Sequence, residues 1–327
     1  MNDGDNDLDV SVIMPAWKAA GFIEHAIRSA LASEGVSVEV VAVDDASPDA
    51  TFETLKRLAT DEPRLRVDRL ETNGGPSAAR NRAIDLARGR FIAVLDADDA
   101  MKPDRLARLV AHATTTGADI VVDDMLETRD TQSGGLPDDR PFLGKAPFDR
   151  ERTITLADYV AWNMPFSGEA CLGYLKPLFR ASALKRTGLR YDPALRNSED
   201  YYLVAHLLAD GAAMRYLPQP GYVYQRAEGS TSHRMTAEHS AAWLAAEAKF
   251  RTAHETDLSA DTLQILEVRG KRLRAVHQFM QSLDMLKARR IGGFVQLLTS
   301  DPGSAPFTFR HLARSVGERV QRKLKSA

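Results

Sequence analysis

The sequence has one cysteine, Cys171, in 327 residues, so the chain cannot form an internal disulfide. Its 43 basic and 45 acidic residues nearly balance, and the formal net charge of -2 argues against a general nucleic-acid-binding protein, which is normally strongly basic. No apolar run approaches the roughly 20 residues needed to span a bilayer. The first nine residues, MNDGDNDLD, lack the apolar core of a signal peptide, so we expect a flexible leader over 1–9 and a cytoplasmic protein.

Two common nucleotide-binding motifs are also missing. The first expected strand, at residues 10–15, is not followed by G-x-G-x-x-G, so a dinucleotide site is poorly supported. No phosphate-binding loop with a Walker lysine occurs either. Binding of a nucleotide would therefore depend on other residues.

What the sequence does contain is a regular alternation of apolar runs and segments of helical periodicity within its first 125 residues. Gly89 stands where the third helix should end, as a C-cap. The alternation predicts an α/β protein with a mostly parallel central sheet covered by helices on both faces. Strands are expected at 10–15, 36–45, 64–71, 90–98 and 118–125, and helices at 21–33, 49–60, 77–89 and 102–117.

The expected strands end in polar residues, and in such sheets ligands bind beyond the carboxyl ends of the strands. The sequence VLDADD places three carboxylates, Asp96, Asp98 and Asp99, directly after one strand. They repel one another unless a positive group lies among them. In NGGPSAARNRA, the helix start and Arg80 could face an anion, although Gly-Gly-Pro is also simply a good loop.

Four motifs occur together: VIMPAWKA, VDDASPD, NGGPSAARNRA and VLDADD. In this order they resemble the family 2 inverting glycosyltransferases of the GT-A fold, of the type that builds bacterial polysaccharides. The resemblance covers roughly residues 9–232. Trp17 stands where the family usually has tyrosine, and Pro48 where threonine is frequent.

The resemblance implies a role for each motif. A divalent cation, Mn²⁺ or Mg²⁺, would be held by Asp98 and by His233, and it would supply the positive charge that the carboxylates need. Asp200 matches the catalytic base, and Glu199 would orient it; both could instead only cap a helix. Arg80 could equally form a salt bridge. The implied nucleotide-sugar pocket comprises Pro15, Trp17, Asp44, Asp45, Ser47, Gly75, Arg80 and Asp96.

The implied activity is transfer of a sugar from a nucleoside diphosphate donor, UDP-linked, to a saccharide hydroxyl, with a lipid-linked acceptor in exopolysaccharide, capsule or O-antigen synthesis. Residues 10–125 would bind the donor, and residues 126–236 the acceptor and the base. One alternative is a sugar-phosphate nucleotidyltransferase, which would require a glycine-rich basic loop where this chain has AWKAAG. Another is a binding module that has lost catalysis.

Residues 237–327 read as basic helices. The last of them places five apolar residues at helical spacing with arginine and lysine around them. Such a helix can lie on an anionic membrane surface, but the pattern also suits a helix packed on the domain. We expect peripheral contact with the inner face of the cell membrane. The apolar residues are Phe309, Leu312, Val316, Val320 and Leu324.

Overall fold

The structure is a computed structural model that describes residues 8–128, 140–169, 171–225 and 235–325, with side chains up to residue 315. The chain forms two compact units. The first, called the sheet unit, consists of Met1–Tyr159 and Ala170–Ser230. The second, called the helical unit, consists of Val160–Glu169 and Thr231–Ala327. The two are described separately.

The described part of the sheet unit contains a ten-stranded sheet in the order β3-β2-β1-β4-β9-β6-β10-β5, with β7 and β8 beside β6 and β10. Parallel pairing joins β3, β2, β1 and β4, and it also joins β6 to β10. The strands are β1 Val10–Ala16, β2 Val38–Asp44, β3 Leu65–Arg69, β4 Phe91–Val94, β5 Ala100–Met101, β6 Ile120–Thr128, β7 Arg140–Pro141, β8 Arg152–Ile154, β9 Leu178–Arg180 and β10 Met214–Gln225.

The predicted central strands are confirmed, but the sheet is mixed because β9 lies antiparallel between β4 and β6. Since both neighbours run antiparallel to β9, the strands β1 to β4, β6 and β10 all point in one direction. Their carboxyl ends therefore lie along one edge. With only three residues, β9 leaves no periodicity by which the sequence could predict it.

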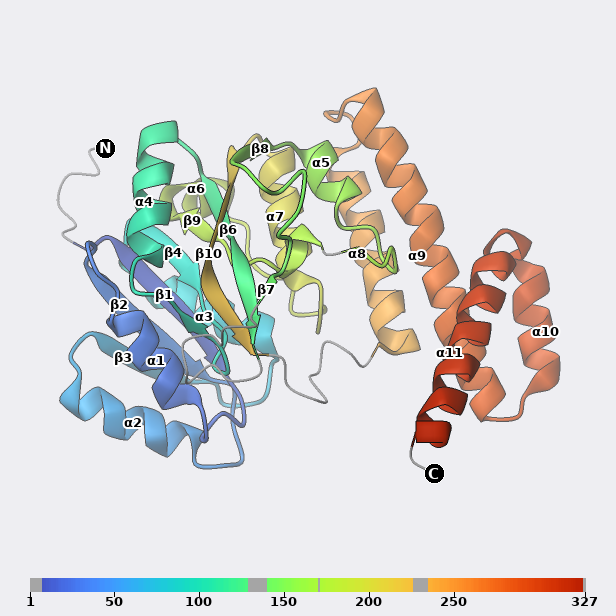
Figure 1. Ribbon diagram of the computed structural model, residues 1–327, viewed down its shortest axis with the longest axis horizontal. Coiled ribbons are helices and arrows are strands. Elements are labelled where there is room, and N and C mark those ends of the chain that lie inside the picture. Colours follow the sequence, from blue (N-terminus) through green and yellow to red (C-terminus); the bar gives the residue numbers. More distant parts are fainter. Residues whose placement is uncertain (1–7, 129–139, 170, 226–234, 326–327) are drawn as a thin grey trace. The chain divides into compact units, whose positions relative to one another are not determined.

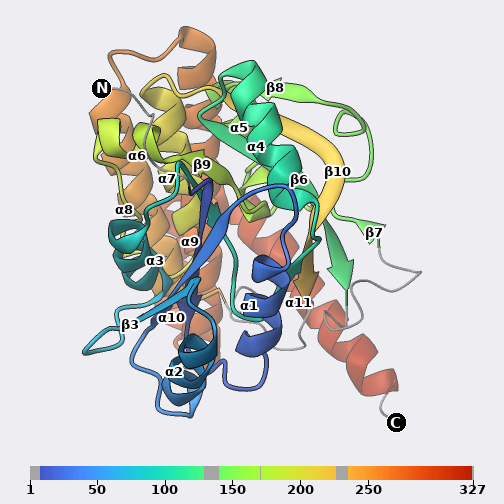
Figure 2. The same cartoon turned by 90° about the vertical axis from the view of Figure 1, so that its left-hand side faces the viewer.

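Helices cover both faces of this sheet (Figures 1 and 2). Helices α1 (Ile23–Leu31) and α4 (Arg105–Thr116) lie on one face, and α3 (Pro76–Leu86) lies on the other, while α2 (Thr51–Asp61) packs near the β3 edge. Because both faces are covered, β1 and β2 are buried almost completely, which explains their continuous apolar runs.

The prediction that Gly89 caps a helix is wrong. Helix α3 ends at Leu86 and its C-cap is Ala87. Gly89 instead lies against β1, where a Cβ would come within 2.5 Å of the Ser11 amide nitrogen. The Ser11 hydroxyl accepts hydrogen bonds from the amides of Arg88 and Gly89, so the chain leaves the helix early to enter the sheet.

Four further helical elements follow: α5 Leu156–Ala161, η2 Leu172–Tyr174, α6 Ala181–Thr187 and α7 Glu199–Ala209. Helix α7 is buried on nearly every side, which its largely apolar sequence after the first turn requires. Tyr201 of α7 stacks on Tyr159, with ring centroids 5.4 Å apart. This packing fixes the first turn of α7, where Glu199 and Asp200 stand.

In the helical unit, α9 is the central element. Arg269 of α9 pairs with Glu247 of α8 at 3.1 Å, both side chains being buried, and also donates to the Asn163 carbonyl. That contact ties the segment 160–169 to α9. The elements of this unit are α8 Ala237–His254, α9 Ala260–Lys287, α10 Ile291–Ser300, η4 Pro302–Ser304 and α11 Ala305–Lys325.

Helix α10 is apolar, yet none of its residues is buried. Ile291 is 59% exposed and Val295 is 52% exposed. Phe294, Leu297 and Leu298 are half-buried. The buried amide of Gln278 also donates to the carbonyls of Leu297 at 3.1 Å and of Asp301, the residue after the helix, at 2.8 Å. Within the described ranges, no helix combines the length and the low polarity that crossing a membrane requires.

The last helix, α11, packs on α9 at its start, where Phe307 contacts Phe279 and the Thr308 hydroxyl donates to Gln278 at 2.8 Å. Of the predicted apolar stripe, Phe309 is exposed and Leu312 is half-buried. The start of α11 thus packs on α9 within the helical unit, while Phe309 faces solvent. The side chains of Val316, Val320 and Leu324 lie outside the described part.

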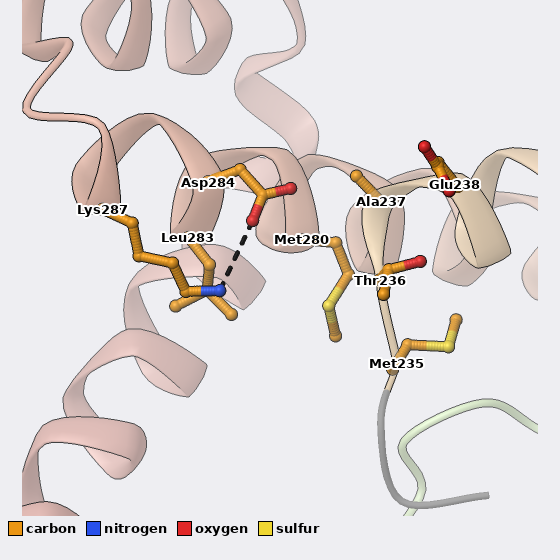
Figure 3. A pocket seen from close by; sticks show the side chains of 8 residues that line it. All are labelled: Met235, Thr236, Ala237, Glu238, Met280, Leu283, Asp284 and Lys287. Carbon is orange, nitrogen blue, oxygen red and sulfur yellow. Dashed lines mark hydrogen bonds and ion pairs between the residues drawn. The ribbon is translucent and has the colours of Figure 1, made fainter. Parts of the chain in front are cut away.

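A hollow of about 260 Å³ opens in the helical unit between the start of α8 and the end of α9 (Figure 3). Methionine and leucine side chains form much of its lining, and Lys287 pairs with Asp284 at 3.4 Å on its side. The lining residues are Met235, Thr236, Ala237, Glu238, Met280, Leu283, Asp284 and Lys287.

Candidate active site

The carboxyl ends of β1, β2 and β4 bring the predicted motifs to one edge of the sheet. The Asp45 amide donates to the Ala16 carbonyl at 2.8 Å, which joins the ends of the first two strands. The Leu95 amide donates to Ile13 at 3.1 Å and continues the pairing toward the acidic loop. The sequence motifs are therefore neighbours in space.

Asp45 anchors the glycine loop before α3. Its two carboxylate oxygens accept hydrogen bonds from the amides of Gly74 at 2.7 Å and Gly75 at 2.8 Å. Burial raises the pKa of Asp45, although these two hydrogen bonds act in the opposite direction. Gly75 has a φ of +83°, and a Cβ there would come within 2.2 Å of the Arg196 guanidinium, so glycine fits both the conformation and the space.

The loops after β1 and β2 support each other. Asp44 is fully buried, pairs with Arg69 at 3.1 Å and accepts the Ser47 amide. The Ser47 hydroxyl accepts the Lys18 amide at 3.1 Å. Trp17 is 51% exposed, with the Lys18 ammonium 4.4 Å from its ring centroid, and Pro15 beside it is half-buried. A flat exposed ring at the end of β1 is suited to stack on a planar ligand.

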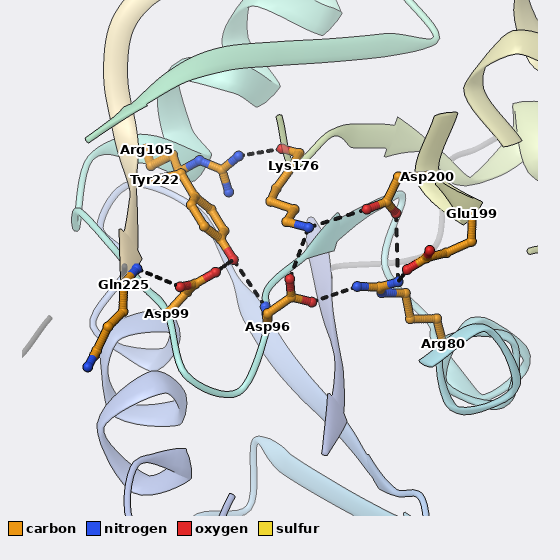
Figure 4. A network of polar contacts seen from close by, with 9 residues as sticks. All are labelled: Arg80, Asp96, Asp99, Arg105, Lys176, Glu199, Asp200, Tyr222 and Gln225. Carbon is orange, nitrogen blue, oxygen red and sulfur yellow. Dashed lines mark hydrogen bonds and ion pairs between the residues drawn. The ribbon is translucent and has the colours of Figure 1, made fainter. Parts of the chain in front are cut away.

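Three carboxylates and two cations form a buried network at the centre of the edge (Figure 4). Arg80 of α3 donates to Asp96 and to Glu199, each at 2.6 Å, and lies 3.8 Å from Asp200. Lys176 lies 2.9 Å from Asp96 and 3.2 Å from Asp200. Two cations thus join the acidic loop after β4 to the first turn of α7.

Charge pairing outweighs burial for both cations. Burial alone would lower the pKa of Lys176, but the charges of Asp96 and Asp200 raise it above its usual range. The pKa of Arg80 is raised for the same reason, with its side chain only 4% exposed. Burial would raise the pKa of Asp96, but Lys176 and Arg80 hold it well below its usual range.

Positive partners for the crowded carboxylates are therefore present in the protein itself. Arg80 forms a salt bridge, which is one of the two roles that the sequence suggested for it. Lys176 was not predicted, because it lies 80 residues beyond Asp96 in the sequence. Its surroundings, GYLKPLF, did carry a signal: a lysine in an otherwise apolar segment needs a partner of opposite charge.

The third carboxylate of the acidic loop, Asp99, has a different task. It accepts hydrogen bonds from the Tyr222 hydroxyl at 2.6 Å and from the Gln225 amide at 2.8 Å, both on β10. Burial, together with the charges of Asp98 and Asp96, raises the pKa of Asp99 well above its usual range. Asp99 thus attaches the loop to the end of β10 and is not available to a ligand.

Asp98, in contrast, is exposed. Partial desolvation by the loop and the nearby charge of Asp96 raise its pKa, so an added positive charge at this position would be favourable. Across the described residues, no group of three or more histidine, cysteine or acidic side chains could hold a metal ion. The carboxylate of Asp98 by itself offers one ligand to a cation, and a bound diphosphate would have to supply the other ligands. His233, the second predicted ligand, lies outside the described residues.

Comparison with known proteins identifies the family. A model described as glycosyl transferase family 2 matches residues 11–181, just over half of the chain. The succinoglycan biosynthesis protein ExoO of Rhizobium meliloti (strain 1021) is 39% identical over 315 residues, which cover 96% of this chain and 86% of ExoO. The chain belongs to glycosyltransferase family 2. The ExoU protein of the same organism is 37% identical to this glycosyltransferase over 69% of the chain and 65% of ExoU.

Solved structures share the fold of this glycosyltransferase. Residues 1–349 of S. aureus TarS, in complex with UDP-GlcNAc, superpose with a TM-score of 0.68 and 21% identity over 91% of this chain and 82% of that one. The mannosyltransferase PcManGT from Pyrobaculum calidifontis, in complex with GDP-Man and Mn²⁺, gives a TM-score of 0.57 with 18% identity over 94% and 80%. The predicted GT-A fold is confirmed.

Proposed function

We propose that this glycosyltransferase moves one sugar from a UDP-linked donor to a saccharide hydroxyl with inversion at the anomeric carbon. The observation that carries the proposal is that Asp96 and Asp200 share the same two cations, Arg80 and Lys176. Asp96 follows β4, at the edge where ligands bind in open α/β sheets. Asp200 begins α7, so a donor-side carboxylate and a candidate base are presented side by side.

Inverting transfer needs a base for the acceptor hydroxyl. Its oxygen bonds to the anomeric carbon while the bond from that carbon to the diphosphate breaks, and the hydroxyl proton passes to the base. Asp200 Oδ2 is bound by Lys176 at 3.2 Å, whereas Oδ1 has no hydrogen-bond partner among the described residues. We assign the proton to Oδ1. Glu199, held by Arg80, orients the start of α7.

The cation we propose is Mn²⁺ or Mg²⁺, and Asp98 and His233 would hold it. When bound, it would supply positive charge that stabilises the leaving diphosphate. Support comes from the exposed carboxylate of Asp98, whose raised pKa reflects partial desolvation and the nearby charge of Asp96. PcManGT, which shares the fold, was solved with Mn²⁺.

For the donor, we propose that the loops after β1 and β2 bind the nucleoside and that the start of α3 faces the diphosphate. TarS and PcManGT were solved with UDP-GlcNAc and GDP-Man, which supports a nucleoside diphosphate sugar. Trp17 would stack on the base. The full set is Pro15, Trp17, Asp44, Asp45, Ser47, Gly75, Arg80 and Asp96.

The acceptor we propose is a lipid-linked saccharide in bacterial exopolysaccharide, capsule or O-antigen synthesis, used on the cytoplasmic side of the membrane. The names of ExoO and ExoU, both succinoglycan biosynthesis proteins, support a polysaccharide pathway. Residues 10–125 would form the donor half and residues 126–236 the acceptor half.

Peripheral membrane contact is part of the proposal, and α10 supports it. Its exposed apolar side chains are accompanied by exposed basic residues on both sides in the sequence, and this combination suits an anionic lipid surface. The basic residues are Lys287, Arg289, Arg290, Arg310 and Arg314.

The test is a screen of nucleotide sugars by thermal shift, with and without manganese, followed by a transfer assay with the donor that binds. We expect a UDP-sugar to stabilise the protein more strongly when manganese is present. A sugar-phosphate nucleotidyltransferase would instead consume a sugar phosphate and a nucleoside triphosphate and release pyrophosphate. A silent binding module would bind the donor but neither transfer its sugar nor hydrolyse it.

A further inference from the structure

Lys176 lies between η2 and β9, and it is buried. Its backbone is fixed from the core, because its carbonyl accepts a 2.6 Å hydrogen bond from Arg105, which is itself paired with Asp123. Both of these partners are fully buried. The lysine side chain therefore extends to the carboxylates from a backbone segment that is fixed in the core, and not from a surface loop (Figure 4).

The ammonium of Lys176 is the one hydrogen-bond donor to the Asp200 carboxylate within the described ranges. Arg80 makes its 2.6 Å contacts with Asp96 and Glu199 and stands 3.8 Å from Asp200. The cluster has three carboxylates and two cations, so it carries a net charge of about -1 with all five groups ionised. Removing the lysine would leave Asp200 with a single and more distant cation.

We propose that Lys176 is a positioning residue that holds Asp200 by Oδ2, leaves Oδ1 free to take the acceptor proton, and couples the base to Asp96 on the donor side. The proposal rests on the proposed role of Asp200. A carboxylate held at one oxygen by a fixed ammonium has a defined direction for the other.

The coupling follows from the shared contacts. Asp96 Oδ2 and Asp200 Oδ2 bind the same ammonium, so a donor that contacts Asp96 changes the environment of the cation that holds the base. Other charged or titratable groups that interact with this cation are Arg80 from α3, Asp98 from the acidic loop and Tyr174 from η2. None of these donates a hydrogen bond to Asp200 in the described part of the chain.

The test compares Lys176→Met, which keeps the length but not the charge, with Lys185→Met, an exposed lysine on α6, as the control. We expect kcat for transfer to fall about tenfold or more in Lys176→Met, while the donor Kd changes less than about threefold. A merely structural lysine would lower kcat and donor affinity together, so the split between the two measurements identifies the positioning role.

The double variant Lys176→Met with Asp200→Asn gives the decisive comparison. If the lysine acts through Asp200, the double variant transfers no more slowly than Asp200→Asn alone. A further loss in the double variant overturns the proposal, as does full kcat in Lys176→Met. The double variant removes one buried charge of each sign, so this comparison holds even where Lys176→Met alone does not fold. Full activity in Asp200→Asn would instead overturn the base assignment itself.

Discussion

The Tyr222 hydroxyl donates a 2.6 Å hydrogen bond to Asp99 and accepts one from the Asp96 amide at 3.1 Å. One phenol on β10 thereby holds both ends of the acidic loop that follows β4. Asp98, the exposed carboxylate between these two anchors, owes its position to them. A side chain 123 residues away from Asp99 in the sequence thus shapes the proposed metal site.

Tyr222→Phe should therefore weaken the attachment of the acidic loop to β10, while the aromatic ring still fills its place in the core. We expect a loss of about 1–2 kcal/mol in the free energy of unfolding, because buried Asp99 loses a donor. Manganese-dependent donor binding should weaken as well. Urea denaturation and donor titration measure the two effects. Tyr224→Phe, two positions along the same strand and only half-buried, is the control and should change neither.

Asp98→Asn should abolish transfer and remove the manganese-dependent part of UDP binding, since the amide cannot balance a divalent charge. The side chain is exposed, so the unfolding midpoint should stay within about 2 °C of the parent. Asp85→Asn, exposed on α3, is the matched control. Full activity of Asp98→Asn, or of the parent in excess chelator, would refute the metal assignment.

Asp200→Asn keeps the size of the side chain but cannot take a proton. Transfer should fall by about 100-fold or more while the donor Kd hardly changes. Isothermal titration with the donor and a steady-state transfer assay separate the two quantities. A parallel collapse of donor binding would mark Asp200 as part of the nucleotide pocket instead of the base.

Gly75→Ala tests the glycine loop. Gly75 and Gly117 both have positive φ, +83° and +69°, but only at Gly75 does a Cβ meet another side chain, that of Arg196. Both alanine variants should lose about 1 kcal/mol of stability from backbone strain. Only Gly75→Ala should also weaken donor binding, because it displaces Arg196 and the loop that Asp45 holds. Equal donor affinity in the two variants would separate this loop from the donor.

The membrane proposal predicts that Ile291→Ser with Val295→Ser weakens binding to vesicles rich in phosphatidylglycerol by about tenfold or more, since two apolar side chains leave the lipid interface. The thermal midpoint should be unchanged, because neither side chain is buried. Val268→Ser, an equally exposed valine on α9, serves as the control. Vesicle flotation that is the same for all three proteins, or equal on neutral lipid, would exclude this surface.

Sequence patterns predicted the central strands and the motifs at their ends because buried parallel strands leave long apolar runs that break off at polar residues. They did not predict β9, which is too short to show a period, or the early end of α3, where close approach to Ser11 overrides the capping preference of Gly89. Within the site, the sequence identified each candidate carboxylate individually. It did not predict that these carboxylates contact Lys176 and Tyr222, since contacts between distant segments depend on the fold.

Gln278 binds the end of α10 through the backbone carbonyls of Leu297 and Asp301, and a backbone carbonyl is the same whatever side chain the residue carries. This part of the attachment of α10 thus does not depend on the chemistry of its outer side chains. Substitutions there can change what the helix adheres to while the helical unit keeps its shape. The exposed positions Ile291 and Val295 could therefore be exchanged to give the helical unit a different outer surface while these two hydrogen bonds stay in place.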